Sequence, residues 1–60
     1  MVNLKELRTA KGLTQEQLAT LCNVQRTTIT MIETGENKPS VPLAMKLGET
    51  LDVEWKEFYE

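Results

Sequence analysis

The sequence predicts an all-α fold, a single compact domain spanning residues 1–60 and built from five short helices. Apolar residues recur three or four positions apart, which is the spacing of one helix face, and no stretch alternates apolar and polar residues as a strand does. Residues that favour helix starts and glycines that favour helix ends divide the chain into pieces of about seven to eleven residues. Short helices with tight joints pack as a small globule rather than as a long bundle.

The first predicted helix begins after Asn3. The Asn3 side chain can accept a backbone N–H of the first turn, while Glu6, three residues later, reaches back to the Asn3 N–H. Gly12 favours a helix end near Lys11 because glycine readily takes the left-handed backbone conformation. The inward stripe of this helix is predicted to be Leu4, Leu7 and Ala10.

Thr14 and Gln17 form a second helix-start pattern, and a third helix is predicted over about residues 26–34. Asn23 lies in the turn between these helices, where it can take a left-handed backbone, and Gly35 ends the third helix. The positions expected to be buried are Leu18, Ala19, Cys22, Val24, Ile29 and Ile32.

Ser40 can begin a fourth helix, because Pro42 then falls in the first turn, where proline is tolerated. Its core positions are predicted to be Leu43, Leu47 and Leu51. A last short helix is predicted from about Glu54, with an irregular start because Glu54 stands where Ser, Thr or Asp is the usual cap. Trp55 and Phe58 are expected in the core, and Tyr59 is expected to be exposed.

Composition excludes several classes of function. The chain has one cysteine, Cys22, and no histidine, so it has neither an internal disulfide nor the residues of a zinc site, and we expect no metal and no cofactor. The usual nucleophile and base pairs are missing as well, so we predict that the protein is not an enzyme. Cys22 lies at an apolar position and is interpreted as a small core residue rather than a redox switch.

The charge distribution matters more than the net charge of −2. Residues 1–40 carry a balance of +1 and residues 41–60 a balance of −3, so the first two-thirds can still present a mildly basic face. The segment 1–6 has no apolar run like that of a signal peptide, and no stretch has the ~18 apolar residues of a membrane span. We therefore expect a cytoplasmic protein with no membrane association.

Residues 14–33 carry the clearest functional signal: two short capped helices joined by a turn of about four residues. The outward positions of the second of these helices are basic or uncharged, and Glu33 falls on the inner side. A surface of this kind fits a DNA major groove, which is about 12 Å wide. The outward residues are Arg26, Thr27, Thr30 and Met31.

The segments Leu-Thr-Gln-Glu-Gln-Leu-Ala, Val-Gln-Arg-Thr-Thr-Ile-Thr-Met-Ile-Glu-Thr-Gly and Lys-Pro-Ser resemble the Cro/lambda-repressor-like helix-turn-helix family, often called the xenobiotic-response-element type. The resemblance covers about residues 3–59. It implies a five-helix lambda-repressor-like domain that binds double-stranded DNA with its third helix in the major groove.

The resemblance also implies roles for individual residues. Gln15 matches a glutamine that contacts the DNA backbone, and Asn37 and Lys38 match a loop that touches it. Arg8 and Glu33 match a partly buried ion pair of structural importance. The positions that match base contacts are Gln25, Arg26, Thr27 and Met31, with Thr28 and Thr30 near the phosphates.

Two of these positions can be assigned chemically, and one departs from the pattern. Arg26 can bond bidentately to guanine, and Thr27 offers a methyl group to thymine. Met31 occupies a site often held by Arg or Gln, which favours an apolar contact there.

We expect the chain to act as a homodimer on a palindromic operator whose half-site centres lie about 34 Å apart. Val41, Trp55 and Tyr59 are the candidate dimer-interface residues. Repression by covering the promoter is the simplest mechanism, and no small-molecule ligand is evident.

Alternatives stay open at this point. The fold can also serve as a protein-interaction module, such as an antitoxin or accessory subunit, and the acidic C-terminal third favours that role slightly. The chain can equally be a complete small protein or a fragment of a longer regulator.

Overall fold

The structure, a computed structural model, describes residues 3–59 as four α-helices and a final 3-10 helix, with no strand in this range. The elements are α1 (Leu4–Ala10), α2 (Gln15–Leu21), α3 (Arg26–Thr34), α4 (Val41–Leu51) and η1 (Trp55–Tyr59). Residues 1, 2 and 60 of the predicted domain lie outside the described residues. The predicted all-helical fold is confirmed, with the last of the five pieces a 3-10 helix. No helix in residues 3–59 is long and apolar enough to cross a membrane.

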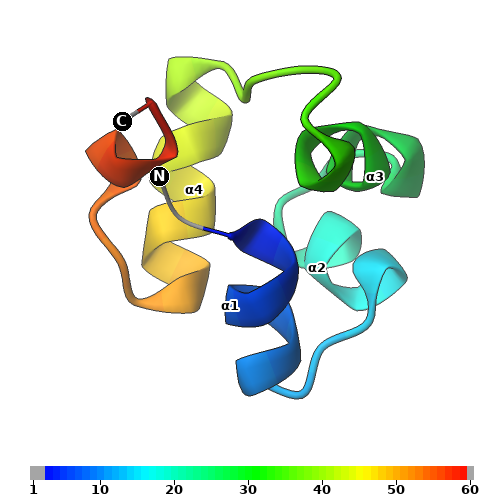
Figure 1. Cartoon of the computed structure of the whole chain (residues 1–60). Helices are drawn as coiled ribbons and strands as arrows, with labels where there is room; N and C mark the ends of the chain where they lie inside the picture. Colours follow the sequence, from blue (N-terminus) through cyan, green and yellow to red (C-terminus); the bar gives the residue numbers. More distant parts are fainter. Residues whose placement is uncertain (1–2, 60) are drawn as a thin grey trace.

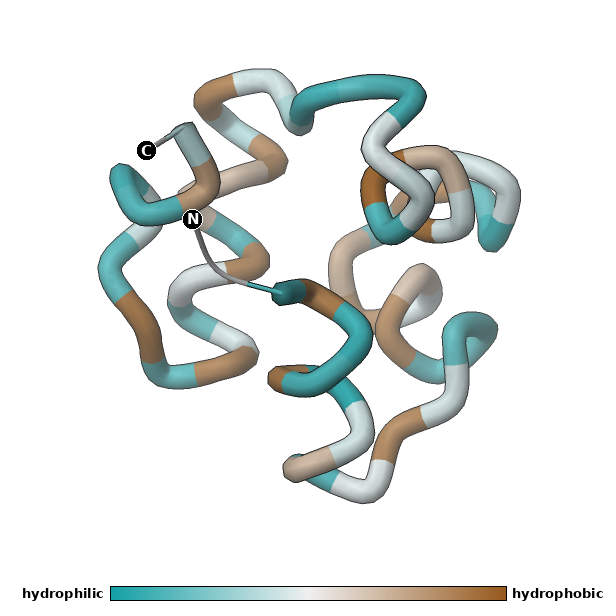
Figure 2. Tube along the Cα trace, viewed as in Figure 1, coloured by the Kyte–Doolittle hydropathy of each residue, from teal (hydrophilic) through white to brown (hydrophobic). Residues whose placement is uncertain are grey.

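The helices form two groups around α1 (Figure 1). The helices α2 and α3 lie together on one side of α1, and α4 and η1 lie on the other. The loop from α3 to α4 crosses between the two groups, and Figure 2 shows that it is largely hydrophilic. This arrangement leaves the outer surface of α3 away from α4 and η1.

The predicted helix starts are present. The Asn3 side chain accepts a hydrogen bond from the Glu6 N–H at 3.1 Å, but the described residues include no return bond from the Glu6 side chain. Thr14 and Gln17 make both bonds of a capping box, at 3.0 and 2.9 Å, which fixes the start of α2. Ser40 caps α4, and Pro42 lies in its first turn as predicted.

Left-handed backbone follows each of the four α-helices. Gly35 ends α3 with φ 84°, and Gly12 follows α1 with φ 71°. Asn23 has φ 58° in the turn between α2 and α3, as predicted. Asp52 ends α4 with φ 63°, which the sequence analysis did not anticipate although Asp is among the few residues that tolerate this conformation.

The core joins both groups of helices. Leu18, Ile29 and Leu47 are the largest fully buried side chains, and they come from α2, α3 and α4. The other buried core residues are Leu4, Ala19, Cys22, Ala44, Leu51 and Phe58. The partly buried side chains that pack against this core include Leu7, Val24, Ile32, Leu43 and Trp55. Ala44 was missed by the sequence analysis.

Ala10 is exposed, so the predicted stripe Leu4, Leu7 and Ala10 is wrong at its last position. The reason is geometric: Arg8 lies one turn after Leu4 on the same face and takes the buried place, with 8% of its surface exposed. The stripe of α1 therefore includes a charged residue, and that residue belongs to the candidate site.

Tyr59 is half-buried rather than exposed, which corrects a second prediction. Its hydroxyl donates to the backbone carbonyl of Pro39, and its ring meets the Trp55 ring edge to face at a centroid distance of 6.1 Å. The turn between α4 and η1 lies so close to α4 that a Cβ at Gly48 would be 2.6 Å from the Val53 carbonyl oxygen. The expected irregular start of the last helix agrees with the 3-10 form of η1.

Candidate nucleic-acid interface

The outer face of α3 begins at its first turn. Gln25, Arg26 and Thr27 are exposed there, and this first turn contains no acidic residue. The Gln25 side chain makes no capping bond to the helix, so its amide is free to bind a ligand. Farther along the predicted contact face, Thr28, Thr30 and Met31 are half-buried. The most accessible of the predicted base-contact residues therefore lie at the start of α3.

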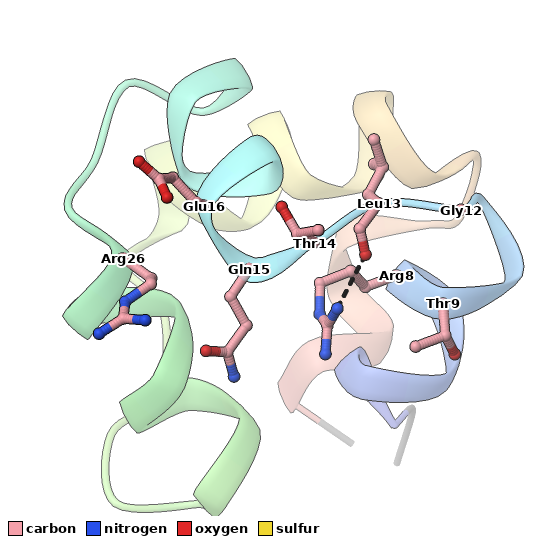
Figure 3. A pocket seen from close by; sticks show the side chains of 8 residues that line it. All are labelled: Arg8, Thr9, Gly12, Leu13, Thr14, Gln15, Glu16 and Arg26. Atoms are coloured by element: carbon pink, nitrogen blue, oxygen red, sulfur yellow. Dashed lines mark hydrogen bonds between the residues drawn. The ribbon is translucent and has the colours of Figure 1, made fainter.

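An open hollow of about 570 Å³ lies beside this turn, between α3 and the turn that joins α1 to α2. Figure 3 shows the Gln15 side chain reaching into it between Arg26 and Arg8. Arg26 makes no ion pair with any other residue in the range 3–59. Glu16 also lines the hollow and is the one acidic residue there. The hollow can thus offer the Arg26 guanidinium and the Gln15 amide to an anion such as a phosphate.

Arg8 and Glu33 form the ion pair that the family resemblance implies. The Arg8 Nε donates to Glu33 Oε2 at 2.7 Å, and the side chains are 10% and 6% exposed. Arg8 also donates through its Nη1 to the Leu13 carbonyl at 2.8 Å. One guanidinium group therefore fixes α1, the α1–α2 turn and α3 to one another.

Gln15 and Thr30 belong to the same network. The Gln15 Nε2 donates to Glu33 Oε1 at 3.1 Å, and the Thr30 hydroxyl donates to Gln15 Oε1 at 3.1 Å. Both residues are predicted DNA contacts, but the hydrogen bond between them was not predicted. The three-residue spacing of Thr30 and Glu33 places them on one face of α3, but nothing in the sequence locates Gln15 against that face.

The pKa of Glu33 is shifted by opposing effects. Burial of the carboxylate raises its pKa, but hydrogen bonds from Arg8 and Gln15, with the positive charges of Arg8 and Lys5, lower it below its usual value overall. Glu33 is therefore ionised at neutral pH and accepts hydrogen bonds from both α1 and α2.

The loop after α3 folds back on the helix. The backbone N–H groups of Glu36 and Asn37 donate to the Met31 carbonyl at 3.0 and 3.3 Å. The Asn37 Nδ2 also donates to the Met31 sulfur at 3.2 Å, so two of the predicted DNA-contact residues touch each other. Lys38 is exposed next to them. The structure thus places Asn37 and Lys38 beside α3, near its C-terminal end.

The predicted dimer residues lie on α4 and η1. Val41 is 49% exposed, whereas Trp55 and Tyr59 are half-buried. Met45, one turn after Val41 on α4, is 50% exposed and lines a shallow hollow together with Trp55. Met45 was missed, although its four-residue spacing from Val41 was a usable signal.

Cys22 is 7% exposed and lies in the core. Burial raises the pKa of its thiol, and a hydrogen bond with Thr50 and the charge of Lys46 only partly oppose this effect. A thiol in such surroundings is chemically inert, which agrees with its interpretation as a core residue.

Comparisons with known proteins agree with this geometry. The family model HTH_3, described as Helix-turn-helix, matches residues 4–58. The uncharacterized HTH-type transcriptional regulator YqaF of Bacillus subtilis is 46% identical over 57 residues, which cover 95% of this chain and 75% of that protein. An uncharacterized HTH-type transcriptional regulator of Methanocaldococcus jannaschii is 39% identical over 56 residues, covering 93% of this chain and 85% of the relative.

A solved structure shows the same fold. The restriction-modification controller protein C.AhdI from Aeromonas hydrophila superposes with a TM-score of 0.82 at 43% sequence identity. The match covers 93% of this chain and 85% of that chain. The chain therefore belongs to the HTH_3 helix-turn-helix family, a family of DNA-binding transcriptional regulators and not of enzymes.

Proposed function

We propose that the protein is a homodimeric repressor that binds a palindromic operator with α3 of each subunit in the major groove. The observation that carries this proposal is the start of α3: Arg26 is exposed and unpaired within residues 3–59, in a turn without acidic residues, beside a hollow that Gln15 enters. A guanidinium in this position is available for base contacts, and the neighbouring hollow is available for the DNA backbone.

The base contacts are assigned to the exposed residues at the start of α3. Arg26 can donate two hydrogen bonds to O6 and N7 of a guanine, and the Gln25 amide can pair with an adenine edge. Thr27 presents a methyl group of the size that packs against a thymine methyl. Met31 lies farther along the helix, and its sulfur already accepts a bond from Asn37, so its methyl group is left for an apolar contact.

The backbone contacts are assigned to both sides of α3. Gln15 lies on the side of the hollow, and Asn37 and Lys38 lie in the loop that follows the helix. Thr28 completes the proposed phosphate contacts, and Thr30 belongs to the same side through its hydrogen bond to Gln15. Contacts on both flanks would fix the angle at which α3 enters the groove, because phosphate contacts set orientation and base contacts set sequence preference.

The subunit interface is assigned to α4 and η1. Val41 and Met45 expose apolar surface on one face of α4, and Trp55 adjoins Met45 in the same hollow. The elements α4 and η1 lie on the opposite side of α1 from α3 in Figure 1. A two-fold pairing through it would leave both α3 helices free, which a palindromic operator requires.

The direct test is selection of the purified protein on a random duplex library at about 0.1 M salt, followed by fluorescence anisotropy with the enriched site. We expect a two-fold site with half-sites about one helical turn apart. Arg26→Ala should weaken binding to that site by roughly 1–3 kcal/mol and relax the preference at one base pair. Lys46→Ala removes an exposed charge on the side of α4 that adjoins Val24, away from Met45; it is the matched control and should bind as wild type.

The absence of any enriched site would contradict the proposal. It would favour the use of this fold as a protein-interaction module, as in an antitoxin or accessory subunit.

The oligomeric state needs its own experiment. Met45→Glu places a charge on the proposed interface and should shift the protein toward monomer in sedimentation equilibrium. Leu21→Glu is the control, because Leu21 is equally exposed at 52% but lies on α2. If both substitutions shifted the protein toward monomer equally, or if neither did, the result would argue against an α4–η1 interface.

A further inference from the structure

Thr30 differs from the other predicted DNA-contact residues of α3 because its hydroxyl already has a partner on another helix. We propose that Thr30 and Glu33 are positioning residues that hold the Gln15 side chain for the DNA backbone. In this view Thr30 affects DNA affinity through Gln15 and not by a contact of its own. This inference rests on the proposed function and names the residues that orient Gln15 for its proposed contact with the DNA backbone.

The chemistry of the network fixes the orientation of the Gln15 amide. The ionised Glu33 carboxylate can only accept hydrogen bonds, so the Gln15 group facing it at 3.1 Å must be the NH₂ and not the carbonyl. The Gln15 carbonyl oxygen then faces Thr30, whose hydroxyl must donate to it at 3.1 Å. Reversing the amide would place its oxygen against the carboxylate, which is repulsive.

This orientation leaves one donor unused. The Gln15 NH₂ carries two hydrogens, and the bond to Glu33 uses one of them. The side chain lines the hollow between Arg8 and Arg26, as Figure 3 shows, so the second hydrogen is in a place where a phosphate oxygen could accept it. A donor that is already held in one orientation loses less conformational entropy when it binds.

The Thr30 hydroxyl has an alternative partner. It lies 3.2 Å from the Arg26 carbonyl oxygen as well as 3.1 Å from Gln15 Oε1, and it has a single hydrogen to donate. If Thr30 bonded only within its own helix, its hydroxyl would donate to the Arg26 carbonyl alone. Thr20 does this: its hydroxyl donates only to the Glu16 carbonyl, at 2.9 Å. Thr20 is therefore a matched control that has the local bond without the link to Gln15.

The test is a double-mutant cycle on DNA affinity. Thr30→Val should weaken binding about 3- to 10-fold, by a similar factor for the enriched site and for unrelated duplexes, because a backbone contact carries no sequence information. Thr30→Ser, which keeps the hydroxyl, should restore most of the affinity. In a Gln15→Ala background, Thr30→Val should have no further effect. Thr20→Val should change nothing.

Two results of the DNA-binding cycle would overturn the proposal. Thr30→Val could weaken binding equally in the absence of Gln15, which would mean a direct contact, or it could have no effect in either background. A second readout is independent of DNA. Thr30→Val, but not Thr20→Val, should shift the side-chain ¹⁵NH₂ resonances of Gln15, and unchanged resonances would also overturn it. Failure of the wild-type protein to bind any duplex would instead refute the proposed function. The Gln15 side-chain resonances would still test whether Thr30 holds Gln15 in place.

Discussion

The two groups of helices on either side of α1 are held together by different means. In the group of α2 and α3, partly buried polar side chains link the helices to each other and to α1: hydrogen bonds of 2.7 to 3.4 Å join Arg8, Glu33, Gln15 and Thr30. In α4 and η1, close apolar packing dominates, through Gly48, Trp55 and Phe58. The acidic excess of the sequence also falls in this second group.

This difference matches what each group is proposed to do. A surface that binds DNA needs donors at fixed positions, and a buried polar network holds side chains in one arrangement because each unmade bond is costly. A surface that pairs with a second copy needs exposed apolar area, which α4 provides at Val41 and Met45. The two groups should therefore respond differently to substitution, with the largest loss of stability in α1–α3.

Breaking the network should have the largest effect on stability. Arg8→Met leaves the Glu33 carboxylate buried without its cation and should lower the free energy of unfolding by about 3–5 kcal/mol. A domain this small has only about 3–5 kcal/mol from its core, so the variant should be largely unfolded at 25 °C by circular dichroism.

The matched control for this prediction is Lys11→Met. It breaks the 3.4 Å pair between Lys11 and Asp52, whose side chains are 43% and 85% exposed, and should cost less than about 1 kcal/mol. Equal losses for Arg8→Met and Lys11→Met would show that the buried network does not hold α1–α3 together.

The packing of the second group should respond most to Gly48→Ala. The added methyl would lie 2.6 Å from the Val53 carbonyl oxygen and 3.1 Å from the Trp55 nitrogen, so the backbone must move. We expect a net loss of roughly 1–3 kcal/mol, since overpacking outweighs the ~1 kcal/mol that alanine gains in a helix. Urea unfolding and Trp55 fluorescence would measure this. Lys46→Ala, at an exposed position of the same helix outside the proposed interface, should stay within about 0.5 kcal/mol.

Tyr59→Phe tests the connection between η1 and the α3–α4 loop. It removes the hydroxyl that donates to the Pro39 carbonyl and should cost about 0.5–1.5 kcal/mol in thermal unfolding. DNA affinity should fall slightly because Lys38 precedes Pro39. A loss no larger than that of Thr20→Val, which removes an exposed hydrogen bond, would mean that the Tyr59 bond contributes nothing to stability.

The smallest effect is expected from pH. Because the folded-state pKa of Glu33 is lowered, the ionised carboxylate stabilises the fold above its ordinary pKa of 4.5, and this contribution is lost as pH falls through the lowered value. The stability advantage of wild type over Glu33→Gln should therefore be constant from pH 6 to 7 and shrink below about 4.5. The effect is small since burial opposes the hydrogen bonds. An advantage that shrinks near neutral pH instead would contradict this assignment.

Most helix boundaries were predictable because their signals are local. Thr14 with Gln17, Ser40, Asn23 and Gly35 act on the backbone within a few residues, and each is found in the conformation that its chemistry favours. The ion pair of Arg8 and Glu33 was available only through the resemblance to a family, since 25 residues separate the two along the chain.

The sequence by itself determined the helical fold, the family and the face of α3 that carries Arg26, because capping, periodicity and motif spacing are all written in nearby residues. Only the tertiary structure decided that Ala10 is exposed, that Tyr59 is tied to Pro39, and that Thr30 reaches Gln15. The physical reason is that a hydrogen bond between elements depends on shifts of a few tenths of an ångström, and those positions are set by the packing of the whole core.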